Sequence, residues 1–199
     1  MDDRLERIHY IIDIDSFLLS SDKLFLIKEL GVADLKNDTC FLYHFQLHRK
    51  FHSLNEKDKR TASFLYHNFN GLFFKDYYGD LPQFKAYSII QDLGRQCDAE
   101  DTIIAYKGGN IEHDILKELG IKNYLDLEDF GAPKFEILLK DPLYIETVRD
   151  IFGSEEKKCL PQNCDRHRTN TINKSYHCPL VEVCYFTSWL INEKEKMQL

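Results

Sequence analysis

Asp13 and Asp15 are the first residues in the chain whose type and spacing point to chemistry. They lie two residues apart in an apolar stretch, so on a β-strand both carboxylates would project from the same face. Two such groups on a buried strand repel each other and lose hydration unless cations or hydrogen-bond donors lie between them. The pair therefore predicts either a metal site or a strand at a sheet edge with a solvated face.

Two later positions could add to this acidic pair. Asp114 lies at the start of an expected helix that follows a strand, where an acidic residue also compensates the helix dipole. His177 and Glu182 are separated by four residues at the start of the last expected helix. With 33 acidic residues and eight histidines in the chain, such a spacing also arises by chance. The order of the three groups along the chain is therefore more informative than any one spacing.

Cysteine and histidine form a second group of candidate ligands near the C-terminus. Cys164 and His167 have the spacing C-x2-H, and Cys178 directly follows His177. Thiolate and imidazole suit a tetrahedral Zn²⁺ ion, but three ligands leave the fourth position open. Cys159 is one candidate for that position.

The elements that must position these residues follow a recognisable order. Three strands are expected over residues 7–15, 24–32 and 39–46, with turn-forming residues between them, which predicts an antiparallel meander. A helix, a strand and another helix follow, an order that fits a parallel strand added beside the meander. The expected helices cover residues 55–69, 82–96, 109–120, 142 onward and 178–192, and the later strands cover 101–106 and 121–127.

Length and composition limit the class of protein. A chain of 199 residues with 43% apolar residues predicts one compact domain over residues 1–199, with a polar tail from about residue 192. No apolar stretch approaches the ~20 residues of a membrane span, and the acidic N-terminus lacks the apolar core of a secretion signal. We therefore expect a cytoplasmic or nuclear protein, not a secreted one. The six cysteines are expected to be buried thiols or metal ligands.

The net charge of −7 argues against a protein that binds nucleic acid mainly through a basic surface. It does not exclude a nuclease, because an acidic metal site can coexist with local basic strips. Two such strips are present, at residues 48–60 and 155–174. Each strip alone is more typical of a solvated charged face.

Taken in order, the acidic motifs resemble those of the DEDDh 3′–5′ exonucleases. The second motif of that family commonly reads H-N-x-x-F-D, and here Asn110 lies four residues before Asp114. The resemblance implies an α/β, ribonuclease H-like fold: a mixed sheet of three antiparallel strands plus parallel strands, flanked by helices. Asp15 stands where the family usually has Glu, and Glu182 where it usually has Asp. Each exchange moves a carboxylate by about one methylene and so changes the metal geometry.

The resemblance also implies a reaction and the roles of the residues. Asp13, Asp15, Asp114 and Glu182 would bind two Mg²⁺ or Mn²⁺ ions about 3.5 to 4 Å apart, for hydrolysis of phosphodiester bonds. His177 would act as general base on the attacking water, for which its ordinary pKa near 6.5 is suitable. The expected substrate is nucleic acid, with RNA favoured over DNA.

The CxxH pattern followed by HC-x3-acid narrows the resemblance to a zinc-containing branch. It is similar to the exonuclease domain of arenavirus nucleoproteins and to the Maelstrom domain, which have a Glu-Cys-His-Cys zinc site. Glu29 matches the position of the Glu in those families, with Cys159 as its rival. Cys178 and Glu182 would share one helix face, so zinc would anchor the helix that presents the catalytic pair. The implied zinc ligands are Glu29, Cys164, His167 and Cys178.

Two other functions stay open on the sequence. One is a catalytically inactive, Maelstrom-like module that binds RNA or acts as a scaffold. The other is a zinc-stabilised interaction domain without a nucleic-acid role, which the negative charge favours. For the nuclease, a set of basic and aromatic residues is expected to contact phosphates and bases. This set comprises Arg166, Arg168, Lys174, Tyr77, Tyr78 and Phe74. A phenylalanine such as Phe74 is more often a core residue, so that alternative stays open.

Overall fold

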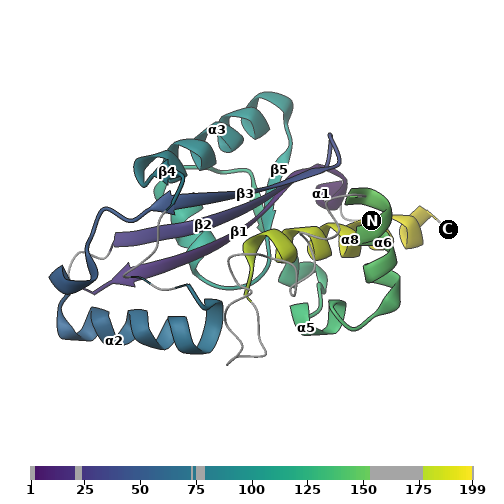
Figure 1. Cartoon of the computed structure of the whole chain (residues 1–199). Coiled ribbons are helices and arrows are strands. Elements are labelled where there is room, and N and C mark those ends of the chain that lie inside the picture. Colours follow the sequence, from purple (N-terminus) through teal and green to yellow (C-terminus); the bar gives the residue numbers. More distant parts are fainter. Residues whose placement is uncertain (1–2, 21–23, 73, 75–78, 153–176, 199) are drawn as a thin grey trace.

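A six-stranded mixed sheet forms the centre of the protein, with the strand order β4-β3-β2-β1-β5-β6 (Figure 1). The structure is a computed structural model that describes residues 3–20, 24–72, 74, 79–152 and 177–198. β1, β2 and β3 pair antiparallel, whereas β5 pairs parallel to β1, β6 to β5 and β4 to β3. The predicted ribonuclease H-like arrangement, three antiparallel strands continued by parallel ones, is confirmed. The strands are β1 (Ile8–Leu19), β2 (Leu24–Asp34), β3 (Thr39–Gln46), β4 (Leu81–Pro82), β5 (Ile103–Tyr106) and β6 (Tyr124–Asp126).

Helices cover both faces of this sheet. Figure 1 shows α3 on one side of the strands and α2 and α8 on the other. Helices α5 and α6 pack against α8 at its side of the sheet. The helices are α1 (Asp3–Glu6), α2 (Glu56–Leu65), α3 (Phe84–Glu100), α4 (Ile111–Glu118), α5 (Phe135–Leu138), α6 (Pro142–Phe152) and α8 (Pro179–Gln198). Shorter helical turns are η1 (Phe51–Ser53), the π-helical η2 (Tyr66–Asn70) and η3 (Leu127–Phe130).

The central strand β1 is buried on both faces. Tyr10, Ile12 and Ile14 belong to the core that α3 and α4 complete. Ile11 belongs to the core beneath α8, and Phe17 to a smaller core beneath α2. This alternation follows from the two-residue period of a strand.

Asp13 and Asp15 follow Ile11 on the face that α8 and α2 cover, and both are buried. β1 has β2 on one side and β5 on the other, so it is an interior strand. The alternative of a solvated sheet edge therefore does not explain this acidic pair.

Asn55, the first residue of the helix expected over 55–69, caps α2, because its side chain accepts a hydrogen bond from the Asp58 backbone N at 2.8 Å. Helix α3 begins at Phe84 instead of near residue 82, since Leu81 and Pro82 pair with β3 as the short strand β4. Short elements of this kind carry too few residues to show a period.

Helix α8 extends to Gln198, beyond the end expected near residue 192. The charged residues that follow are good helix formers, and Lys196 Nζ pairs with Glu193 Oε1 at 2.7 Å. The segment predicted as a polar tail is therefore largely a continuation of the helix.

The cysteines of the described segments, at positions 40, 97, 178 and 184, are buried. This agrees with the expectation of buried thiols. Within the same segments, the structure contains no helix with both the length and the apolar character needed to cross a membrane. The cytoplasmic or nuclear location stays a prediction.

Candidate functional site

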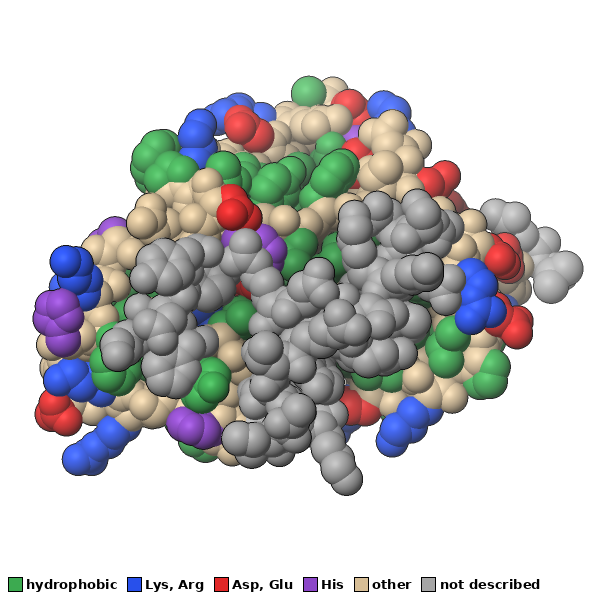
Figure 2. All heavy atoms as spheres, viewed as in Figure 1, with side chains coloured by type: hydrophobic (Ala, Val, Ile, Leu, Met, Phe, Trp, Pro, Cys, Tyr) green, Lys and Arg blue, Asp and Glu red, His purple; other side chains and the backbone are tan. Residues whose placement is uncertain are grey.

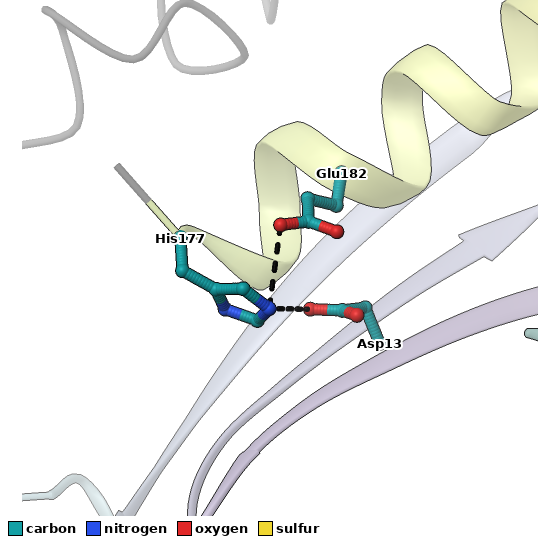
Figure 3. A group of neighbouring side chains, drawn as sticks. All are labelled: Asp13, His177 and Glu182. Atoms are coloured by element: carbon teal, nitrogen blue, oxygen red, sulfur yellow. Dashed lines mark ion pairs between the residues drawn. The ribbon is translucent and has the colours of Figure 1, made fainter. Parts of the chain in front are cut away.

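Asp13, His177 and Glu182 meet at the start of α8 and form a small polar cluster (Figure 3). His177 Nε2 lies 3.3 Å from Glu182 Oε1 and 3.9 Å from Asp13 Oδ2. One ligand atom of each residue lies within 4.8 Å of the other two. In the part of the chain that the structure describes, no other three His, Cys, Asp or Glu side chains meet in this way. The cluster has the size and the donor atoms to hold a cation.

A close approach between α8 and β2 brings the cluster together. Gly31 pairs with Asp13 across the sheet, and a Cβ atom at Gly31 would lie only 2.3 Å from the carbonyl oxygen of Pro179. Glycine therefore lets the first turn of α8 rest directly on the strand beside Asp13. Pro179 begins the helix, where its missing N–H costs nothing. His177 and Glu182 are thereby held above β1.

Glu112, which was not selected from the sequence, supplies a third carboxylate. It is buried in the first turn of α4, and its Oε1 accepts a hydrogen bond from the backbone N of Ile14 at 2.9 Å. β5 pairs with β1 only as far as Ile11, so the Glu112 side chain binds the β1 backbone beyond the end of β5. Ile14 lies between Asp13 and Asp15, which places Glu112 beside the acidic pair.

The structure does not bring Asp114 into this cluster. The Asp114 side chain is 53% exposed, and its Oδ1 lies 3.1 Å from Nδ1 of the neighbouring His113. Residues two apart on a helix point in nearly opposite directions, so Glu112 and Asp114 cannot both face β1. A sequence signal for Glu112 did exist, because it shares the i, i+3, i+4 stripe with the buried Ile115 and Leu116.

Asp15 has different neighbours from Asp13. Its Oδ1 accepts a hydrogen bond from Asn70 Nδ2 at 2.8 Å, and its Oδ2 lies 3.4 Å from Nζ of the fully buried Lys28. The Lys28 ammonium also lies 4.4 Å from the centre of the Phe17 ring. The β1–β2 register shifts at this point, since Asp15 lies opposite Glu29 and Ser16 opposite Ile27. This bulge places Lys28 beside the acidic pair.

Burial and mutual repulsion raise the pKa values of the carboxyl groups in the cluster. Burial, assisted by the charge of Asp13, raises the pKa of Glu112 to about 8. Burial likewise raises the pKa of Glu182 to about 8, although His177 acts to lower it, and burial raises the pKa of Asp13. Burial acts to lower the pKa of His177, but the carboxylates led by Glu182 and Asp13 outweigh it and raise that pKa to about 9.

These residues fit a hard divalent cation. Carboxylate oxygens are the ligands that Mg²⁺ and Mn²⁺ prefer, and imidazole also binds Mn²⁺. Asp13 Oδ2 is buried and has no hydrogen-bond partner among the described atoms, which is costly unless a cation compensates it. A cation between Asp13 and Glu182 would also stabilise the charged carboxylates, whose pKa values burial raises.

The residues expected to bind zinc are only partly within the described segments. Glu29 and Cys178 are both fully buried, and Glu29 Oε1 lies 2.8 Å from Nδ1 of His44, a neighbour that the sequence did not indicate. Three other candidate ligands, Cys159, Cys164 and His167, lie outside the described residues. The structural zinc site therefore stays a prediction.

Phe74 was one of the aromatic residues expected to stack on nucleobases. It is buried and packs against Phe17, with the ring centres 4.8 Å apart. The alternative of a core position is confirmed for Phe74, and the stacking role is excluded, because its ring belongs to the core beneath α2. The other residues of that set, Tyr77, Tyr78, Arg166, Arg168 and Lys174, lie outside the described residues.

Comparisons with known proteins support the fold. No family model and no curated protein matches this sequence. Among solved structures, the chain is similar to the exonuclease domain of Mopeia virus, partially complexed with manganese. The similarity covers 96% of this chain and 79% of the viral chain, with a TM-score of 0.56 and 13% sequence identity. At this level of identity, the two chains share a fold.

Proposed function

We propose that the protein is a divalent-metal-dependent 3′–5′ exonuclease of DEDDh type that hydrolyses nucleic acid, with RNA favoured. The observation that carries the proposal is the meeting of Asp13 from β1 with His177 and Glu182 at the start of α8, beside the point where Glu112 of α4 binds the β1 backbone at Ile14. Carboxylates gathered from separate elements destabilise a fold unless they serve a cation. The shared fold with a viral exonuclease domain supports the same conclusion.

Each residue has a distinct part in this proposal. Asp13 and Glu182 would bind Mg²⁺ or Mn²⁺, and the bound ion would activate water and stabilise the leaving 3′ oxygen. Glu112 takes the place that the sequence assigned to Asp114, and it holds the β1 backbone at Ile14. His177 Nε2 would accept the proton of the attacking water, since a cation among the same carboxylates removes the charge that raises its pKa.

Whether the site can bind two metal ions or only one depends on Asp15. The two-ion mechanism implied by the resemblance needs Asp15 as a further ligand. Asp15 would then exchange its contact with Lys28 for a contact with a cation. We retain the two-ion mechanism as part of the proposal, with this exchange as its requirement.

The surroundings of Asp15 favour a second candidate, a catalytically inactive RNA-binding or scaffold module of Maelstrom type. Asn70 and Lys28 contact the two oxygens of Asp15, so the protein itself partly neutralises the acidic pair. If these contacts persist, the site binds nucleic acid without cleaving it. In both candidates the expected zinc site would have a structural role.

Digestion of 5′-labelled single- and double-stranded RNA and DNA with Mg²⁺ or Mn²⁺ tests the proposal. Wild-type protein is expected to give a ladder shortened from the 3′ end. The ladder should vanish for Glu112→Gln and persist for the matched control Asp114→Asn, whose side chain is exposed.

Absence of cleavage of all four substrates by folded wild-type protein would overturn the enzyme proposal. If that protein still bound RNA, the inactive module would be favoured. Loss of the ladder in Asp114→Asn, with activity kept in Glu112→Gln, would return the role to Asp114.

A further inference from the structure

The π-helical turn η2, which continues α2, is attached to the candidate site at two points. The carbonyl oxygen of Phe69 accepts a hydrogen bond from the backbone N of His177 at 3.4 Å. Asn70, the next residue, donates through Nδ2 to Asp15 at 2.8 Å. Gly71 ends the turn with a φ of 66°, a conformation that favours glycine. The turn is therefore fixed to β1 and to the start of α8, and π-helical turns are frequent at functional sites.

Two phenylalanine rings project into solvent from this region. The side chains of Phe64 and Phe69 are 56% and 47% exposed, and their ring centres lie 5.7 Å apart. The two residues are five positions apart, and the π-helical turn, with its wider spacing, begins between them. Single exposed apolar residues are common on proteins, but two adjacent rings beside a polar cluster form a distinct surface.

Basic side chains precede these rings on the same helix face. Lys57, Arg60 and Phe64 are spaced i, i+3 and i+7, so they form one stripe along α2, and all three are exposed. No salt bridge to Lys57 or Arg60 is present within the described segments. Figure 2 shows Lys, Arg and His side chains gathered at the α2 end of a molecule whose net charge is −7. This stripe suits a polyanion.

We propose that Phe64 and Phe69 form a stacking platform for the bases of a single-stranded nucleic acid whose 3′ end lies at the Asp13–Glu182 site. Lys57 and Arg60 would contact its phosphates. The inference rests on the proposed function and names the strandedness of its substrate. Aromatic rings stack on any base, whereas the base faces of a duplex are already stacked on one another. Proteins bind single strands through aromatic rings that stack on bases and basic residues that contact phosphates. This surface has both, and η2 connects it to the cluster.

Fluorescence of 2-aminopurine, which is quenched by stacking, tests the platform. The base is placed near the 3′ end of a single-stranded oligonucleotide, and the full chain is titrated with Ca²⁺ in place of Mg²⁺, with the oligonucleotide checked to be intact. We expect wild-type protein to quench the fluorescence. Phe64→Ala/Phe69→Ala should lose the quenching and bind about tenfold more weakly for each base contact removed.

Phe84→Ala is the matched control, because Phe84 is 65% exposed but lies on α3 at the other face of the sheet. This variant should quench and bind like wild-type protein. Quenching and affinity in the double variant equal to wild type would overturn the platform, even if the wild-type protein cleaves nucleic acid. Binding and quenching without cleavage would support the platform and contradict the exonuclease. Failure of wild-type protein both to bind and to cleave any single strand would contradict both.

Discussion

Asp13 and Asp15 lie on the same face of one strand, yet the protein surrounds them in opposite ways. Around Asp13 it gathers Glu182, Glu112 and His177, and burial raises the pKa values of the carboxyl groups. Around Asp15 it supplies the Lys28 ammonium and an amide hydrogen bond. The Asp13 half therefore combines carboxylates and an imidazole, a donor set that fits an external cation, whereas the Asp15 half is already paired with a lysine.

Activity should respond most strongly to changes in the carboxylates that are proposed to bind the cation. We expect Asp13→Asn or Glu182→Gln to lower metal-dependent cleavage by about a thousandfold or more, since each removes charge from the atoms that would bind the ion. Steady-state cleavage of a labelled oligonucleotide, together with Mn²⁺ titration by calorimetry, measures both effects. Asp114→Asn serves as the charge-matched surface control. Full activity in Asp13→Asn would contradict the assignment of the site.

Removing the carboxylate charge should change the free energy of unfolding in opposite directions in the two halves. Asp15→Asn removes the carboxylate that lies 3.4 Å from the buried Lys28 ammonium, and we expect it to lower the free energy of unfolding by about 3 kcal/mol. Asp13→Asn removes a repelled charge and should raise the stability of the metal-free protein. Urea unfolding in the presence of a chelator measures both.

The double variant Asp15→Asn/Lys28→Met sharpens this test. If the cost of Asp15→Asn arises from an uncompensated ammonium, removal of that ammonium should recover much of the loss. Equal stability of Asp15→Asn and Asp13→Asn would contradict the difference between the halves.

The position of the start of α8, which brings His177 and Glu182 to Asp13, depends on Gly31. Gly31→Ala puts a Cβ 2.3 Å from backbone at Pro179, so we expect the start of α8 to move, with a cost of about 1–3 kcal/mol in stability. Cleavage should fall by about a hundredfold, because a shift of about 1 Å displaces His177 and Glu182 from Asp13.

Gly94→Ala is the matched control, since its Cβ would meet only the side chain of Ile121 in the core under α3. It should cost stability but leave cleavage unchanged once the protein is folded. A parallel loss of activity in both variants would show that general destabilisation, and not the position of α8, is responsible.

The sheet and most helices could be predicted because they follow from local alternation of apolar residues and from capping. The antiparallel pairing of β1, β2 and β3 and the start of α2 after Asn55 are examples. The burial of Glu112 also has a local signal, because it shares the i, i+3, i+4 stripe of α4 with Ile115 and Leu116.

Lys28 and Asn70 could not have been predicted in this way. The position of Lys28 depends on a register shift between β1 and β2, and that of Asn70 on a π-helical turn. Neither feature has a periodic signal, and both depend on contacts between residues far apart in the chain. The environment that distinguishes Asp15 from Asp13 is thus a tertiary property.

The stability of the metal-free protein is also expected to depend on pH. Glu112 and Glu182, with pKa values raised from 4.5 to about 8, bind more protons in the folded than in the unfolded state. Stability should therefore fall as pH rises through that interval. His177, raised from 6.5 to about 9, acts in the same direction between those values. Thermal unfolding between pH 5 and 9 is expected to show a melting temperature several degrees lower at the alkaline end.

Mn²⁺ should remove most of this dependence of stability on pH. The ion competes with protons for the same carboxylate oxygens, so it stabilises the folded protein more as the protons dissociate at higher pH. Glu112→Gln should flatten the metal-free profile without Mn²⁺, since one of the titrating carboxyls is then absent. Asp114→Asn should leave it unchanged. A metal-free profile that rises with pH would show that the Asp13 half is already compensated, as the Asp15 half is by Lys28, and the distinction between the two halves would fail.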